Sequence, residues 1–209
     1  MRLRRIKGIE EKIKEYSDVI IFDPENKKGN WKKLFDNDNP IYLEIGMGKG
    51  NFILKNAKSY PDINYIGCEL SDSITYLAAK KIRGTKNLFV INKDASHLLD
   101  IFEENEIKKI YLNFSDPWPK SRHEKRRLTS KSFLDIYKKL IGKGGEIEFK
   151  SDNRKLFEYS VLMFIQEGFE FLDLSLDLHQ DKDDVITTEY EDKFMSLNQP
   201  IYYVKVRVK

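Results

Sequence analysis

The sequence predicts an α/β fold with a seven-stranded, mostly parallel sheet, helices on both faces and an antiparallel final strand. Short apolar runs alternate with longer amphipathic segments, and glycines or prolines separate the two kinds of segment. This alternation is typical of a parallel sheet covered by crossover helices. No helical pattern sufficient for a crossover separates the last two strands, so we expect them to be antiparallel.

Each strand is expected where an apolar run of four to ten residues is bounded by turn residues. The seven strands are expected at residues 41–45, 63–68, 88–91, 107–114, 146–150, 169–178 and 201–208. The helices between them are expected at residues 51–58, 71–83, 95–104, 129–140 and 154–167. Ser71 and Thr129 are suitable N-caps, and Gly84 is expected to end the second helix.

Length and composition are those of one globular domain. The 209 residues are 40% hydrophobic and 34% charged, with a formal net charge of +3, which is ordinary for a domain of this size. We expect one domain over residues 1–209, with residues 1–30 as a basic N-terminal arm or helix and residues 179–199 as an insertion. The basic character is local, because Arg2, Arg4, Arg5 and Lys7 open the chain.

Several protein classes are excluded by what the sequence lacks. No apolar run approaches the ~20 residues needed to span a bilayer, and the N-terminus has no signal-peptide pattern. The single cysteine, Cys68, excludes an internal disulfide, and its apolar surroundings indicate a buried, unreactive thiol. His97, His123 and His179 show no metal-ligand spacing. A cytoplasmic protein without a membrane anchor or a metal is therefore expected.

Candidate site residues follow the ends of five predicted strands. In a parallel sheet, ligands bind beyond the carboxyl ends of the strands, near the switch in strand order. The residues at these ends are Glu44 to Gly50, Glu69, Asp94, Asp116 and Asp152. Five placements on one edge are harder to explain as chance than any single motif.

A glycine-rich turn follows the first strand. Gly46, Gly48 and Gly50 have the spacing G-x-G-x-G, which is neither the dinucleotide fingerprint G-x-G-x-x-G nor a Walker A motif. A plain strand-to-helix turn is the alternative. Glu44, directly before the turn, would repel a pyrophosphate and suits a cationic group such as an amine.

Two further carboxylates lie at strand ends. Glu69 can accept hydrogen bonds from both hydroxyls of a ribose, or it can be a helix-start carboxylate with Asp72. Asp94 can accept from an adenine amino group, or it can cap the helix that begins near Ala95. Carboxylates for an amine, a ribose and an adenine, without a phosphate-binding group, indicate S-adenosylmethionine as the cofactor.

The most specific motif begins where the predicted strand 107–114 ends. The Asp116 carboxylate lies between Ser115 and the stiff sequence Pro117-Trp118-Pro119. Six lysines or arginines then occur from Lys120 to Lys131, both ends included. This pattern is suited to chemistry on a base within a polyanion. A turn residue before proline is the alternative for Asp116, and Trp118 can either border the base or fill the core.

Three segments together resemble the bacterial tRNA (guanine-N7-)-methyltransferase family: residues 43–50, residues 113–120 with the basic segment, and residues 188–191. The resemblance extends from about Trp31 to the C-terminus. It implies a Rossmann-like class I methyltransferase fold, S-adenosylmethionine as cofactor, tRNA as partner and the variable-loop guanine, position 46, as target.

The resemblance also implies roles for individual residues. Asp116 is expected to be catalytic. The cofactor would be bound by Glu44, Gly46, Gly48, Gly50, Glu69, Asp94 and Asp116. The tRNA would be bound by Lys120, Arg122, Lys125, Arg126, Arg127, Asp152, Thr188, Glu189, Tyr190 and Glu191, so that the insertion 179–199 would contact the substrate.

Two other functions remain open from the sequence. One is a class I methyltransferase that acts on an amino nitrogen of adenine or of a protein glutamine, although Pro117 is followed here by Trp118 where those enzymes have a second proline. The other is a catalytically silent RNA-binding module. The sequence is compatible with a monomer or a homodimer.

Overall fold

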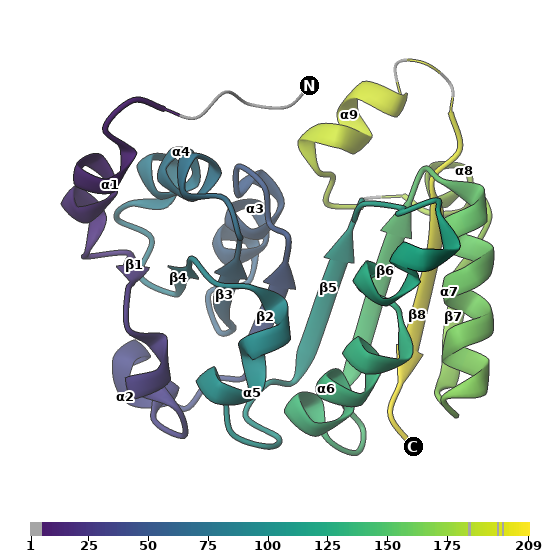
Figure 1. Cartoon of the computed structure of the whole chain (residues 1–209), viewed down its shortest axis with the longest axis horizontal. Coiled ribbons are helices and arrows are strands. Elements are labelled where there is room, and N and C mark those ends of the chain that lie inside the picture. The colour runs from purple at the N-terminus through teal and green to yellow at the C-terminus, as the bar shows by residue number, and fades with distance from the viewer. Residues whose placement is uncertain (1–5, 184, 196, 198) are drawn as a thin grey trace. The chain divides into compact units, whose positions relative to one another are not determined.

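The computed structural model describes residues 6–183, 185–195, 197 and 199–209. It divides into two compact units, residues 1–103 and 104–209, and each is described on its own. Eight strands occur in the described residues, four in each unit (Figure 1). The sequence predicted seven, and the additional strand is a two-residue pairing near the N-terminus.

The first unit contains four parallel strands in the order β1-β4-β3-β2. Its strands are β1 (Ile20–Ile21), β2 (Ile41–Ile45), β3 (Asn64–Cys68) and β4 (Leu88–Ile91). Its helices are α1 (Ile9–Lys12), η1 (Ile13–Tyr16), η2 (Pro24–Lys27), α2 (Trp31–Phe35), α3 (Asn51–Ser59), α4 (Asp72–Ile82), η3 (Ala95–His97) and α5 (Leu98–Ile101). All five residues of β3 are buried, as expected for a central parallel strand.

The second unit has the strand order β5-β6-β8-β7. Its strands are β5 (Lys109–Asn113), β6 (Glu146–Ser151), β7 (Glu170–Ser175) and β8 (Tyr202–Arg207). Its helices are η4 (Ser121–Arg126), α6 (Lys131–Ile141), α7 (Arg154–Gln166), α8 (Leu178–Asp181) and α9 (Glu189–Met195). β8 inserts antiparallel between β6 and β7, which confirms the predicted antiparallel end of the sheet.

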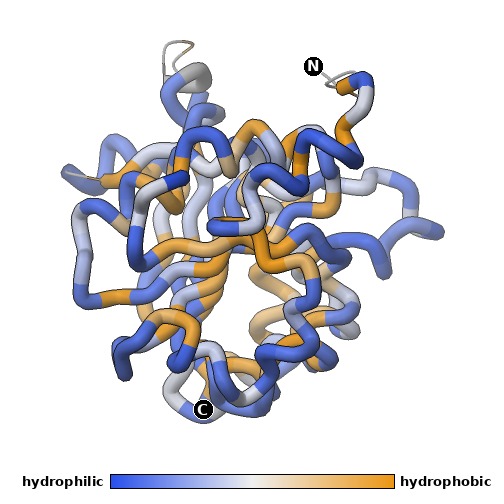
Figure 2. The backbone as a smooth tube through the Cα atoms, turned by 90° about the vertical axis from the view of Figure 1, so that its left-hand side faces the viewer, coloured by the Kyte–Doolittle hydropathy of each residue, from blue (hydrophilic) through white to orange (hydrophobic). Residues whose placement is uncertain are grey.

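Apolar stretches concentrate in the strands, whereas the connecting segments are mostly hydrophilic (Figure 2). Helix α6 packs on β5, and α7 packs on β6 and β8. The stacked rings of Phe149 and Phe157 show how β6 meets α7, with centroids 6.3 Å apart.

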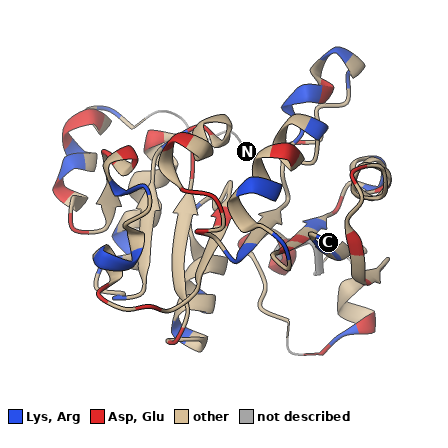
Figure 3. Ribbon diagram, turned by 90° about the horizontal axis from the view of Figure 1, so that it is seen from below, with Lys and Arg blue, Asp and Glu red and all other residues tan. Residues whose placement is uncertain are grey.

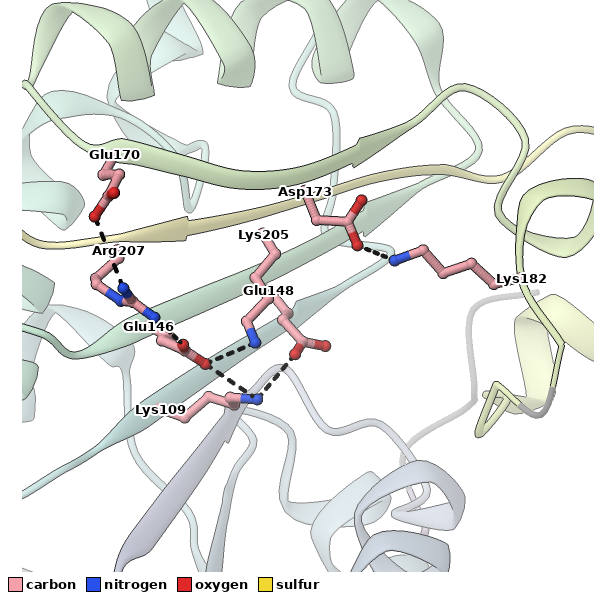
Figure 4. A network of polar contacts seen from close by, with 8 residues as sticks. All are labelled: Lys109, Glu146, Glu148, Glu170, Asp173, Lys182, Lys205 and Arg207. Atoms are coloured by element: carbon pink, nitrogen blue, oxygen red, sulfur yellow. Dashed lines mark hydrogen bonds and ion pairs between the residues drawn. The ribbon is translucent and has the colours of Figure 1, made fainter.

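The opposite face of β6 carries charge. Glu146 and Glu148 alternate with the buried Ile147 and Phe149, and Glu146 pairs with Lys109, Lys205 and Arg207 on the neighbouring strands (Figure 4). Burial raises the pKa of Glu146, but hydrogen bonds from Lys205 and Arg207 outweigh it and the pKa is lowered.

Three local predictions were wrong or incomplete. The helix expected at 95–104 is a 3-10 turn followed by four α-helical residues, η3 and α5. The N-cap residue of α6 is Ser130, without a side-chain cap bond, and the hydroxyl of Thr129 is instead buried against that of Ser160 at 2.7 Å. Ser71 is the N-cap residue of α4, without a side-chain cap bond.

The section 1–30, predicted as a basic arm or helix, contains α1, η1, β1 and η2 in its described part. Ile9, Ile13, Val19 and Ile20 of this section are buried. Arg2, Arg4 and Arg5 lie outside the described residues. Residues 20–21 pair with residues 90–91, so this section adds an edge strand beside β4.

Cys68 is 2% exposed, and burial is the main reason that its pKa is raised to about 12. The prediction of a buried thiol is therefore confirmed, and a raised pKa disfavours the reactive thiolate. Among the described helices, none combines the length and the apolar character required to cross a membrane.

Candidate active site

The glycine turn of the first unit connects β2 to α3. Gly46, Gly48 and Gly50 have φ angles of 74°, 56° and 75°, a left-handed conformation that favours glycine. The Gly46 and Met47 amides donate to the carbonyl of Cys68 at 2.8 and 3.2 Å, which fixes the turn against the end of β3. A Cβ added at Gly46 or Gly48 would have no atom within 4 Å. The backbone of the turn is therefore open to a ligand.

Glu69 follows β3 directly and joins the glycine turn to the start of α4. Its Oε2 accepts from the amide of Gly48 at 3.2 Å, and its Oε1 accepts from the amide of Ser71 at 3.0 Å. These two bonds place the Glu69 carboxylate directly beside the glycine turn. Glu44, at the end of β2, is 2% exposed. The structure thus brings Glu69 and the glycine turn together.

Asp94 caps the 3-10 turn η3. Its Oδ1 accepts from the amide and the hydroxyl of Ser96 at 2.8 and 2.7 Å, and these two bonds lower its pKa. The cap was one of the two roles open from the sequence. Both bonds fall on Oδ1, so the cap does not use Oδ2.

Sequence reasoning missed two residues beside these carboxylates. The Asn92 side-chain amide donates to the carbonyl of Glu69 at 2.9 Å and to the hydroxyl of Thr75 at 3.2 Å, linking the ends of β3 and β4. Leu70, directly after Glu69, is 66% exposed. The sequence contained one signal for Leu70, which is an apolar residue directly after the strand-end carboxylate of Glu69.

In the second unit, Asp116 lies in the loop that follows β5 and its side chain is exposed. Phe114 and Trp118, two positions before and two positions after Asp116, have φ angles of 52° and 40°. Left-handed backbone at a non-glycine residue costs about 1–3 kcal/mol and is often found at functional sites. The segment 114–119 is hereafter called the Asp116 corner.

The basic segment follows this corner as the 3-10 helix η4. Lys120, Arg122, Lys125 and Arg126 are exposed, whereas Arg127 is half-buried. The Arg126 guanidinium lies 4.9 Å from the Trp118 ring centroid, and the His123 ring meets Trp118 edge to face at 5.6 Å. Lys and Arg are interspersed with Asp and Glu along much of the chain (Figure 3). Residues 120–127 differ from this general distribution because most of their charged side chains are cationic.

Residues 188–191 form a capping box at the start of α9. The Thr188 amide donates to Glu191 Oε2 at 2.7 Å, and the Glu191 amide donates to the Thr188 hydroxyl at 3.0 Å. Thr188 and Glu191 are buried, and Glu189 and Tyr190 are exposed. Of the four residues predicted to contact the substrate, the two exposed ones have accessible side chains. The other two hold the helix.

Two contacts join this segment to the ends of β5 and β6. The rings of Phe114 and Tyr190 stack with centroids 5.9 Å apart and an interplanar angle of 18°. At the end of β6, Lys150 Nζ binds Glu191 Oε1 at 2.9 Å and the carbonyl of Ile186 at 3.1 Å. Lys150 was missed by sequence reasoning, although its place at the end of the predicted strand was a signal.

Asp152 follows β6 and is exposed, next to Asn153, which caps α7 by accepting from the Leu156 amide at 2.9 Å. No group of three or more His, Cys, Asp or Glu side chains suited to a metal ion occurs within the described ranges.

Comparisons with solved structures define the class of the fold. The chain aligns with the 16S rRNA methyltransferase KamB at a TM-score of 0.66 and 12% identity, covering 87% of this chain and 93% of KamB. A second structure, of an antibiotic-related methyltransferase, gives a TM-score of 0.64 at 17% identity, covering 85% and 92%. The predicted fold class, a class I methyltransferase, is confirmed.

Comparisons of sequence define the family. Residues 38–204 match the family model described as "Putative methyltransferase". The tRNA (guanine-N(7)-)-methyltransferase of Bacillus velezensis is 51% identical over 99% of this chain and 96% of its own length. Those of Bacillus subtilis and Streptococcus thermophilus are 49% and 48% identical, covering 99% and 100% of this chain and 98% and 100% of their own lengths. The chain belongs to the bacterial tRNA (guanine-N7-)-methyltransferase family.

Proposed function

We propose that this protein transfers a methyl group from S-adenosylmethionine to N7 of the variable-loop guanine, position 46, of tRNA. The observation that carries the proposal is identity of about half the sequence, over nearly the whole chain, with relatives named tRNA (guanine-N(7)-)-methyltransferase. The exposed Asp116 corner and the cationic segment beside it are the features of this structure that suit the substrate.

The first unit has groups that fit the cofactor. The open backbone at Gly46 and Gly48 would allow close approach of the cofactor. Glu69, whose carboxylate lies beside this turn, would accept from the ribose hydroxyls, and Asp94 Oδ2 would accept from the adenine amino group. Glu44 is suited to the amino group of the methionine part. Gly50 opens helix α3 and completes the turn. When bound, S-adenosylmethionine would supply a methyl group carried on a positively charged sulfur.

Guanine N7 has a lone pair, so its attack on the methyl carbon requires no proton removal. The new N–C bond forms as the C–S bond breaks, and the guanine ring becomes cationic. Asp116 would accept from the N1 and amino hydrogens of the guanine, which aligns N7, and its negative charge would stabilise the positive charge that grows on the ring. Asp116 is proposed to contact the cofactor as well.

The tRNA would be bound through its phosphates by Lys120, Arg122, Lys125 and Arg126. Asp152, Glu189 and Tyr190 are exposed and available to the same substrate. Thr188 and Glu191 act in this proposal by holding α9. The protein works in the cytoplasm as a monomer or a homodimer.

Nucleoside analysis tests the reaction. Unmodified tRNA is incubated with the protein and labelled S-adenosylmethionine, digested to nucleosides and separated. Labelled 7-methylguanosine, absent from a tRNA with adenine at position 46, is the expected result. A labelled methyladenosine would indicate an amino-nitrogen methyltransferase instead, and tRNA binding without cofactor binding would indicate a silent RNA-binding module.

A further inference from the structure

Arg127 differs from the other cations of the basic segment because its guanidinium contacts the protein backbone. Its Nε donates to the carbonyl of Pro117 at 3.2 Å, and its Nη2 donates to the carbonyl of Trp118 at 3.2 Å. A guanidinium presents its N–H groups in a rigid planar fork. Two successive carbonyls are thus held by one side chain.

The same guanidinium also lies over an aromatic ring. Arg127 Cζ is 4.3 Å from the centroid of Tyr159, which belongs to α7. The Tyr159 hydroxyl donates to Glu124 Oε1 at 3.0 Å, and burial together with Glu124 raises the pKa of Tyr159 to about 12, so this hydroxyl remains a donor at neutral pH. Arg127 is therefore fixed against a helix of the second unit on one side and the Asp116 corner on the other.

The Asp116 corner needs such support. Pro117 and Pro119 have no backbone N–H, which reduces the hydrogen bonds that the loop can make with itself. Phe114 and Trp118 are held in left-handed conformations, which persist only when surrounding contacts impose them. The carbonyls that Arg127 binds belong to the two residues directly after Asp116.

We propose that Arg127 is a positioning residue, which holds the Asp116 corner in its active conformation and does not bind an RNA phosphate. The proposal rests on the proposed function for its catalytic consequence. It separates Arg127 from its neighbour Arg126, which is exposed and lies against the Trp118 ring. The two arginines thus form a matched pair for experiment.

The first test is kinetic. Arg127→Gln and Arg126→Gln are compared with the wild type in single-turnover methyl transfer at saturating tRNA and S-adenosylmethionine, and in tRNA binding from about 50 to 200 mM salt. For Arg127→Gln we expect the saturated rate to fall about 10- to 100-fold, as for misplacement of a catalytic group, with the salt slope unchanged. For Arg126→Gln we expect a shallower slope, since a protein that neutralises one phosphate fewer releases fewer counterions. A shallower slope with a normal saturated rate in Arg127→Gln would overturn the proposal.

Two further variants test whether the guanidinium fork and the ring beneath it hold the corner. Arg127→Lys keeps the charge but loses the fork, so we expect it to remain as slow as Arg127→Gln; recovery of the wild-type rate would overturn the proposal. Tyr159→Leu removes the ring beneath the guanidinium. We expect it to lower the saturated rate, and the double variant with Arg127→Gln to be no slower than Arg127→Gln alone, because both changes release the same loop. Additive losses would contradict this.

Limited trypsin digestion without tRNA provides a readout that does not depend on methyl transfer. If Arg127 holds the corner, cleavage after Lys120 should be several-fold faster in Arg127→Gln and unchanged in Arg126→Gln. Equal cleavage in all three proteins would overturn the inference. Absence of 7-methylguanosine formation by the wild type would instead refute the proposed function.

Discussion

Lys150 and Glu191 form an ion pair with 2.9 Å between Nζ and Oε1, and their side chains are 3% and 0% exposed. The pair joins the end of β6 to the first turn of α9, 41 residues later in the chain. Glu191 also closes the capping box with Thr188. One buried carboxylate therefore fixes the segment that carries Glu189 and Tyr190.

Removal of one partner of this pair should be strongly destabilising. Lys150→Met leaves the Glu191 carboxylate in a buried site, and we expect a loss of about 3–5 kcal/mol in the free energy of unfolding. Arg154→Met breaks the exposed pair Arg154–Glu158, whose side chains are 75% and 55% exposed, and should cost at most about 1 kcal/mol. Urea unfolding measures the free energy of unfolding of both variants. Similarly small losses in the two variants would show that the buried pair does not contribute more to stability than the exposed pair.

Replacement of Glu69 should weaken cofactor binding. Glu69→Ala removes the carboxylate proposed for the ribose, and we expect a loss of about 1.5–3 kcal/mol, or roughly 10- to 150-fold in Kd. Glu25→Ala removes a carboxylate paired with Lys93 elsewhere in the first unit and should leave this Kd unchanged. Calorimetric titration with S-adenosylmethionine makes the comparison. Wild-type affinity in a folded Glu69→Ala protein would remove Glu69 from the ribose site.

The charge of Asp116 should matter more to turnover than to binding. Asp116→Asn keeps the shape, and we expect turnover to fall about 10²–10³-fold, with a smaller effect on cofactor affinity, because the ring charge develops only near the transition state. Single-turnover rates across pH should show no steep basic limb from guanine deprotonation. A folded Asp116→Asn variant with a near-normal rate would leave Asp116 as a turn residue.

The exposed cations of the basic segment should determine the salt dependence of tRNA binding. Arg122→Gln with Lys125→Gln should reduce the slope of log K against log salt by about 0.7–0.9 for each phosphate that the variant no longer neutralises. Lys14→Gln with Lys32→Gln removes the same charge from exposed sites in the first unit and serves as the control. Equal slopes in the two double variants would show that only net charge matters.

Glu146 should stabilise the fold at neutral pH but not in acid. Burial raises its pKa, yet hydrogen bonds from Lys205 and Arg207 lower it below the ordinary value of 4.5. Its stabilisation is therefore fully present above pH 4.5 and is lost as the pH falls through the lowered value. Glu146→Gln should reduce the free energy of unfolding at pH 7. The difference between the variant and the wild type should become smaller as the pH falls below 4.5, the ordinary pKa of the carboxyl group. A pH-independent difference would contradict this account.

The sequence predicted those elements that local pattern determines. Strand β2 was predicted with its observed bounds, because an apolar run ends directly at Gly46. Strand β1 was not predicted, since Ile20 and Ile21 are a strand only through pairing with β4. Thr129 looked like a helix cap, but Ser160, which binds it, is 31 residues away in the chain.

For the site as well, the sequence predicted the features that depend on local pattern and missed those that depend on tertiary contacts. The strand-end positions of Glu69 and Asp116 followed from the order of apolar runs and turns. Arg126 and Arg127 are adjacent and equivalent as sequence, and only the carbonyls of Pro117 and Trp118 distinguish them. The partnership of Lys150 with Glu191 depends on tertiary contact, which no local pattern encodes.

The burial of Cys68 has a consequence for the protein under oxidative stress. Its carbonyl accepts the amides of Gly46 and Met47, so a bulky group on the neighbouring sulfur would disturb the glycine turn. Peroxides and disulfides react with exposed thiolates, whereas this thiol is 2% exposed and protonated at neutral pH. Because Cys68 is the one cysteine of the chain, the protein offers thiol-specific oxidants no exposed sulfhydryl group to modify.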